Sequence, residues 1–81
     1  MTREEVTQKL TGSFHDLFED DSIVLFDAMT AKDVKGWDSL NHINLIIMTE
    51  KEFKIKFTTK EIQNLPNVGN FIDLILKKLG A

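Results

Sequence analysis

The chain has 81 residues, of which 42% are hydrophobic, and it carries a formal net charge of −3. This acidic balance excludes a general affinity for nucleic acid, because proteins that bind it usually present a basic patch or stripe. A chain of this length can bury one modest core, so we expect a single domain over residues 1–81. It has no cysteine, and its two histidines alone make a poor metal set, so we expect no metal site.

The sequence shows no signal for export or for membrane insertion. Its start, residues 1–5, is polar and acidic where a secretory signal needs an apolar stretch. No later apolar run approaches the length of a transmembrane helix. We therefore expect a monomeric cytoplasmic protein that does not insert into membranes.

The first predicted helix begins near Thr2 and ends near Phe18. Thr2 and Glu5 form a Thr-x-x-Glu capping box, which is typical of a helix start. Gly12 lies inside the helix and costs about 1 kcal/mol relative to alanine, so any irregularity is expected in the second half. The apolar residues that recur at helical spacing are Val6, Leu10, Phe14, Leu17 and Phe18.

A long loop is predicted from Glu19 to Gly36. Loops of this length in small domains are usually functional when they are ordered. Apolar residues can anchor this loop across a helical core, while carboxylates keep its outer side in water. The expected anchors are Ile23, Val24, Leu25, Phe26, Met29 and Val34.

An α+β fold is a second possibility on the residues alone. Residues 23–26 are apolar, and residues 53–57 alternate with the period of a strand, so the two segments could pair. We rank this alternative second, because an isolated two-stranded ribbon is only marginally stable in water.

The second long helix is predicted from Ser39 to Phe53. Gly36 interrupts the preceding segment, and Asp38 is a suitable N-cap, so Ser39 falls in the first turn with its hydroxyl exposed. The unpaired N–H groups and the helix dipole favour a negative group at such a position, for example a covalently attached phosphate. By the capping rules alone, however, a serine here needs no chemistry.

Both sides of this helix carry apolar residues. A small bundle needs only one apolar side for its core, so the other is either covered by the loop or free for a partner protein. At about 100° per residue, the core side holds His42, Leu45, Ile46, Thr49 and Phe53. We assign the other side, the partner stripe of Leu40, Ile43 and Ile47 with Asn44 beside it, to partner binding.

His42 and Trp37 are interpreted as packing residues. A serine–histidine nucleophile also needs an orienting carboxylate and an oxyanion hole, and no Gly-x-Ser-x-Gly elbow surrounds Ser39. We therefore expect His42 to be partly buried near Ser39, and Trp37 to anchor the end of the loop on the bundle. No catalytic residue is expected, and the protein is not predicted to be an enzyme.

Two more helices complete the pattern. Thr58 and Glu61 form a second capping box, which opens a short helix that ends at Pro66. Asn67 caps a last amphipathic helix that reaches to about Leu79. The expected fold class is therefore all-α: a four-helix bundle with three longer helices, one short third helix and a long loop between helices one and two.

Asp38-Ser39-Leu40, placed between a long loop and an apolar helix, resembles the attachment motif of the acyl carrier protein family. The resemblance covers nearly the whole chain and extends to the fold, an acyl-carrier-like bundle. It implies that Ser39 carries 4′-phosphopantetheine as a phosphodiester, with Asp38 and Leu40 as the flanking motif. It also implies that the thiol of this arm holds acyl intermediates as thioesters.

The same resemblance implies the partners of the chain. They are a phosphopantetheinyl transferase, an acyl-loading ligase or transferase, and downstream enzymes that use the acyl group. Two alternatives stay open at this point. The chain could be a peptidyl or D-alanyl carrier protein, or it could be an unmodified helical adaptor in which Ser39 only begins a helix.

The charge distribution departs from the family's usual pattern. Residues 1–50 hold four basic and ten acidic side chains, whereas residues 51–81 hold six basic and three acidic ones. Ordinary fatty-acid carriers place several carboxylates just after the serine, where this chain has Asn41, His42 and Asn44. Since charge patterns govern the choice of partner, we expect a specialised pathway, such as polyketide or other dedicated biosynthesis, rather than general fatty-acid synthesis.

Overall fold

The computed structural model describes residues 1–63 and 65–80, and these residues form helices and loops without a strand. The four α-helices are α1 (Arg3–Phe18), α2 (Ser39–Phe53), the short α3 (Thr59–Gln63) and α4 (Val68–Lys78). A 3₁₀ helix, Ala31–Asp33, lies in the long loop between α1 and α2. The all-α expectation is thus confirmed, and the α+β alternative is wrong for the described residues.

The helix boundaries follow from the caps. Thr2 and Glu5 form both hydrogen bonds of the expected capping box at the start of α1. α1 is continuous through Gly12, and Glu19 ends it in the left-handed region, with φ of 52°. The second box is also present, because the Thr58 N–H donates to Glu61 Oε1 at 2.8 Å. Asn67 caps α4 by accepting a hydrogen bond from the Asn70 N–H at 2.9 Å.

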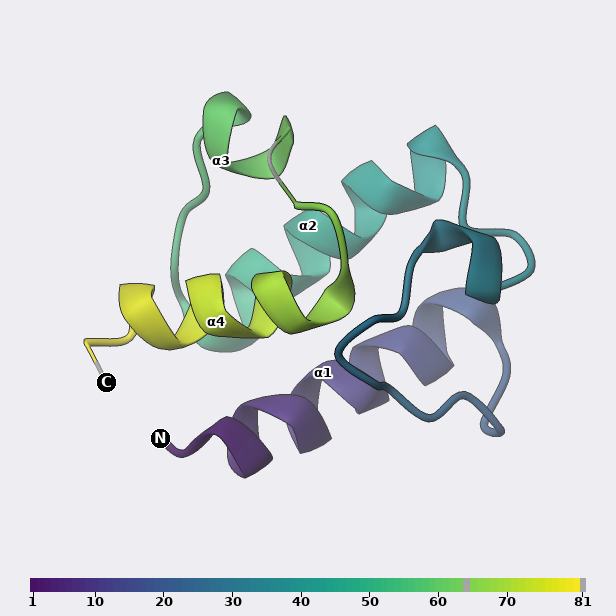
Figure 1. The fold of residues 1–81 in the computed structure, drawn as a ribbon, viewed down its shortest axis with the longest axis horizontal. Helices are drawn as coiled ribbons and strands as arrows, with labels where there is room; N and C mark the ends of the chain where they lie inside the picture. The colour runs from purple at the N-terminus through teal and green to yellow at the C-terminus, as the bar shows by residue number, and fades with distance from the viewer. Residues whose placement is uncertain (64, 81) are drawn as a thin grey trace.

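The core lies where α1 packs against α2 and α4. Figure 1 shows α3 on the side of the molecule away from α1, with the long loop running beside α1 back to the start of α2. The predicted core side of α2 is confirmed, since its buried residues are Leu45, Ile46, Thr49 and Phe53. The buried apolar residues of the other segments are Val6, Leu10, Phe14, Met29, Val34, Val68, Phe71, Ile72 and Ile75.

The long loop is anchored by four of its six expected apolar residues. Met29 and Val34 are buried, and Ile23 and Leu25 pack partly buried against the core. The expectation was wrong for Val24 and Phe26, which are 77% and 50% exposed. In an extended stretch consecutive side chains point to opposite sides, so residues 23–26 can bury only every second one.

Backbone hydrogen bonds tie the middle of this loop to the start of α4. The Val68 N–H donates to the Met29 carbonyl at 2.8 Å, and the Gly69 N–H donates to the Asp27 carbonyl at 2.9 Å. A Cβ at position 69 would lie 2.9 Å from the Asp27 Cβ, so only glycine fits there without a shift of the loop. Arg3 forms ion pairs with both Asp27 and Asp73, which adds the start of α1 to this junction.

None of the described helices has both the length and the apolar character that crossing a membrane would require.

The two sides of α2 should differ in their contribution to stability. Leu45 is fully buried, so Leu45→Ala leaves a core cavity and should lower the free energy of unfolding by about 2–5 kcal/mol. Ile47 is 43% exposed, so Ile47→Ala should cost clearly less. Urea unfolding of both variants, without any prosthetic group, measures the difference. Equal losses would show that the Ile47 side belongs to the core.

Candidate functional site

Ser39 is the first residue of α2, and its side chain is exposed. The expected cap precedes it: Asp38 Oδ1 accepts a hydrogen bond from the Asn41 N–H at 2.8 Å. The Asp38 carbonyl accepts the first helical hydrogen bond, from the His42 N–H at 2.9 Å. The N–H groups of Ser39 and Leu40 precede that first bond and stay available for a negative group, as at any helix start.

The turn before α2 is held by backbone geometry and by one side chain. Gly36 has φ of 89°, a left-handed conformation that side chains other than glycine rarely adopt. Asn41 reaches back over this turn, and its Nδ2 donates to the Gly36 carbonyl at 2.7 Å. From the sequence, Asn41 is notable only because it stands where related carriers have a carboxylate. The one sequence signal for its bond to the Gly36 carbonyl is that a side-chain amide follows the glycine turn by five residues.

Trp37 anchors the end of the loop, as expected. Its ring meets that of Phe14 edge-on, with centroids 5.2 Å apart and an interplanar angle of 86°. A second aromatic contact, to Phe18, has a centroid distance of 6.2 Å. Edge-to-face pairs of this kind add to the stabilisation that comes from buried area alone. The residue two positions before Ser39 is therefore fixed on α1.

Trp37 also bonds to His42 on α2. Its Nε1–H donates to His42 Nδ1 at 3.2 Å, and the two rings lie nearly parallel at 24°. Because indole can only donate, Nδ1 is the acceptor and the neutral imidazole carries its hydrogen on Nε2. Partial burial lowers the pKa of His42 below its ordinary value, since the charged form loses hydration. His42 is thus partly buried, as predicted, and the structure adds that its ring is neutral and accepts a hydrogen bond from Trp37.

This hydrogen bond also argues against a serine–histidine nucleophile. In such a site a carboxylate orients the Nδ1–H of the histidine, whereas here Nδ1 accepts a hydrogen bond from Trp37. Within residues 1–63 and 65–80, no group of three or more His, Cys, Asp or Glu side chains could hold a metal ion.

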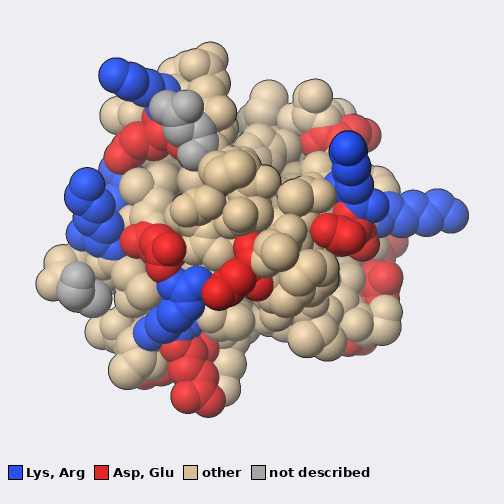
Figure 2. Space-filling view, in the orientation of Figure 1, with Lys and Arg blue, Asp and Glu red and all other residues tan. Residues whose placement is uncertain are grey.

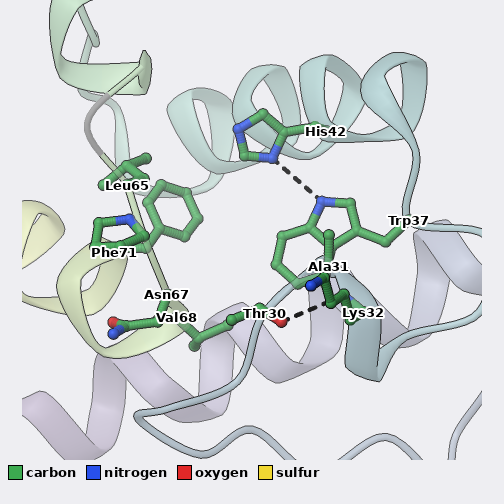
Figure 3. Close-up of a pocket in the computed structure, with 10 residues that line it drawn as sticks. Thr30, Ala31, Lys32, Trp37, His42, Leu65, Asn67, Val68 and Phe71 are labelled. Carbon is green, nitrogen blue, oxygen red and sulfur yellow. Dashed lines mark hydrogen bonds between the residues drawn. The ribbon is translucent and has the colours of Figure 1, made fainter.

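Two hollows lie around Trp37 and His42. The outer hollow contains Ser39 itself and is lined by Ala31, Trp37, Asp38, Ser39, His42 and Ile43. The inner hollow has a volume of about 350 Å³ and is lined by Thr30, Ala31, Lys32, Trp37, His42, Leu65, Pro66, Asn67, Val68 and Phe71. Figure 3 shows Trp37 and Ala31 on one side of the inner hollow, with Leu65 and Phe71 on the other. Ala31, Trp37 and His42 border both hollows.

The partner stripe is open to solvent, so the idea that the long loop covers it is wrong. Leu40, Ile43 and Ile47 are 67%, 56% and 43% exposed. Asn44 is half-buried beside them. At the end of the stripe, Ile47 lines a shallow depression together with Glu50, Lys51, Lys54, Ile55 and Lys56. The surface is thus apolar near Ser39 and basic at its far end.

Comparison with known proteins places the chain in a family, although no family model matches it. Over 80 residues it is 32% identical to an acyl carrier protein of Thermotoga maritima, and the match covers 98% of both chains. The chain belongs to the acyl carrier protein family. It is also 30% identical to an acyl carrier protein of Thermosynechococcus vestitus over 82 residues, covering the whole of both chains.

A solved structure agrees with this assignment. The solution NMR structure of the holo acyl carrier protein from Geobacter metallireducens superposes with a TM-score of 0.87 at 48% sequence identity. The match covers 93% of this chain and 86% of that one. Acyl carrier proteins are carriers rather than enzymes, so this member of the family is a carrier of acyl groups with the helical fold expected from its sequence.

Because the pKa of His42 is lower in the folded protein than in the unfolded chain, the free energy of unfolding depends on pH. Because the unfolded chain binds this proton more readily, stability should fall as the pH drops below about 6.5 and through the folded-state pKa. The carboxyls with lowered pKa, those of Glu5, Asp20 and Glu61, have ordinary values near 4 and lose their contribution at lower pH.

We expect urea unfolding between pH 7.5 and 5.5 to show a smaller loss of stability for His42→Gln than for the unaltered carrier protein. Glutamine keeps an amide near Trp37 but does not titrate. An equal loss in both proteins over this range would contradict a depressed pKa for His42.

Proposed function

We propose that Ser39 Oγ is the attachment point of the family's cofactor, 4′-phosphopantetheine, whose thiol carries acyl intermediates as thioesters. The observation that supports this most directly is the position of Ser39, exposed and directly after a capped helix start within Asp-Ser-Leu. Asp38 and Leu40 supply the flanking motif. A phosphopantetheinyl transferase would form the bond between Ser39 Oγ and the phosphorus of the arm, with coenzyme A as the donor. The pyrophosphate bond of coenzyme A breaks, adenosine 3′,5′-bisphosphate leaves, and the serine hydroxyl loses its proton.

The residues around Ser39 fit such a group. A phosphodiester on Oγ would lie near the N-terminus of a 15-residue helix, where free N–H groups and the helix dipole favour negative charge. The Asp38 carboxylate accepts a hydrogen bond from the Asn41 N–H at the start of the helix. Its negative charge is therefore already stabilised by a hydrogen-bond donor of the chain. The arm supplies the thioester chemistry when it is attached, and the chain's own residues only hold and orient it.

The alternatives have less support. A peptidyl or D-alanyl carrier would use the same serine with another cargo, but both curated relatives are acyl carrier proteins. An unmodified adaptor would leave the position of Ser39 without a role. We regard residues 1–81 as one acyl carrier domain that acts as a cytoplasmic monomer, and these assignments remain predictions.

The family implies interaction with a phosphopantetheinyl transferase and with acyl-using enzymes. We propose that these partners bind the partner stripe, Leu40, Ile43 and Ile47, together with Asn44. The stripe begins one residue after Ser39 and keeps three large apolar side chains exposed along one side of α2. Exposed apolar groups of this size cost free energy in water, and a partner surface recovers it.

A specialised pathway is the narrower proposal. The first two turns of α2 carry neutral Asn41, His42 and Asn44, and all three are at least partly buried by local contacts. Partners that dock on an acidic helix would find no carboxylates there. A dedicated loading ligase or transferase that reads apolar side chains suits this surface better.

Ser39→Ala should abolish loading and leave the fold intact. The lost hydroxyl is exposed, and Asp38 still caps the helix, so the free energy of unfolding should change by less than about 1 kcal/mol. Intact mass after incubation with coenzyme A and a broad-specificity phosphopantetheinyl transferase measures the loading. A Ser39→Ala variant that still gains one arm, or that no longer folds, would contradict the assignment.

Carboxylates introduced at the start of α2 should increase acyl transfer by general fatty-acid enzymes. They should not increase acyl transfer by the protein's own dedicated partner. Asn41→Asp with Asn44→Asp recreates the acidic helix edge. This edge attracts ordinary partner enzymes through charge. Asn44→Asp alone is the matched control, because Asn41→Asp also removes the donor to the Gly36 carbonyl. Acyl transfer to each loaded carrier is measured over a range of salt concentrations, since salt screens such attraction.

The unaltered carrier is expected to work poorly with fatty-acid enzymes and to respond weakly to salt. If it already matches a standard carrier with those enzymes, and loses that activity steeply as salt is added, the specialised pathway is wrong.

A further inference from the structure

His42 lines both hollows. Its ring borders the outer hollow together with Ser39, and it borders the inner hollow together with Leu65 and Phe71. A cargo on an arm at Ser39 that lay in the inner hollow would therefore contact this ring. At about 350 Å³ the inner hollow is within the range of small-molecule sites, roughly 300–1,000 Å³.

The walls of the inner hollow are mainly apolar. The apolar side chains in its lining are those of Ala31, Trp37, Leu65, Pro66, Val68 and Phe71. Figure 2 shows uncharged side chains across the upper centre of the face that carries α3 and α4, with charged groups below this area and at its edges. Such a wall suits an acyl chain, and the few polar groups in it decide which acyl chain fits best.

Several of these polar groups are already engaged. Thr30 Oγ1 accepts a hydrogen bond from the Lys32 N–H at 3.3 Å, and Asn67 Oδ1 accepts one from the Asn70 N–H at 2.9 Å. His42 differs, because Trp37 occupies only its Nδ1. Figure 3 shows the other ring nitrogen, Nε2, pointing away from Trp37.

The indole fixes the direction of the remaining hydrogen bond. Since Nδ1 accepts a hydrogen bond from Trp37, the neutral ring carries its hydrogen on Nε2. In this form Nε2 is a hydrogen-bond donor and cannot act as an acceptor. A saturated acyl chain lying against this N–H would remove its water without replacing the hydrogen bond, which is unfavourable. An acyl chain with an oxygen atom next to His42 Nε2–H would accept its hydrogen bond.

We propose that His42 is a specificity-determining residue whose Nε2–H donates a hydrogen bond to a carbonyl or hydroxyl oxygen on the acyl chain in the inner hollow. The carrier then favours oxygenated acyl groups over saturated ones of the same length. This inference rests on the proposed function, because it requires a cargo arm on Ser39. The lowered pKa of His42 supports it, since the neutral ring persists at physiological pH.

The test compares cargoes of equal length. The protein is loaded at Ser39 with octanoyl, 3-oxooctanoyl or 3-hydroxyoctanoyl phosphopantetheine from the corresponding coenzyme A thioesters, and intact mass confirms each product. The oxygenated cargoes should raise the Tm above that of the octanoyl form by about 4–8 °C, as a hydrogen bond of ordinary strength does in a domain of this size. They should also shift the ¹⁵N resonance of His42 Nε2.

Two variants separate the hydrogen bond from packing. His42→Leu keeps an apolar wall but has no donor, so the oxygenated and saturated cargoes should give the same Tm. His42→Gln retains an N–H donor and should keep part of the difference. The ¹⁵N measurement on the unaltered protein stands independently if His42→Leu fails to fold.

Equal Tm values and unchanged Nε2 resonances for all three cargoes in the unaltered protein would overturn the proposal. A difference that persists in His42→Leu would overturn it as well. A protein that gains no arm at all would instead refute the proposed function, so the two failures are distinguishable by mass alone.

Discussion

The packing of Trp37 is the interaction on which the rest of the site depends. This one side chain packs edge-on against Phe14 of α1, and it donates a hydrogen bond to His42 of α2. Trp37 therefore fixes the end of the long loop on α1. Through His42, it also fixes the beginning of α2 on this loop. Ser39 lies two residues later, so its exposed position is set by a contact with α1 rather than by the capping residues alone.

A second constraint holds the middle of the same loop. The Met29 and Asp27 carbonyls accept hydrogen bonds from Val68 and Gly69, which places the start of α4 against the loop. The inner hollow forms between these two fixed points, with α2 above it and the segment before α4 beside it.

The helix boundaries and the core side of α2 were predictable from the sequence, whereas the set of residues that meet in the inner hollow was not. Ser39 and Phe53 bound α2 as expected, because a cap, a glycine turn and helical periodicity are written within a few residues. The exposure of Val24 was missed, since an apolar stretch does not reveal which of its side chains meet the core. The inner hollow joins residues 30 and 71 through tertiary packing, and the sequence carries no signal for that neighbourhood.

The most direct test of the account is to locate the prosthetic arm on the unaltered protein. After treatment with coenzyme A and a broad-specificity phosphopantetheinyl transferase, proteolysis and tandem mass spectrometry identify the modified residue. One arm per chain is expected, on Ser39, with the buried Ser13 and the exposed Ser22 unmodified. An arm on either of those serines, or no arm on any residue, would contradict it.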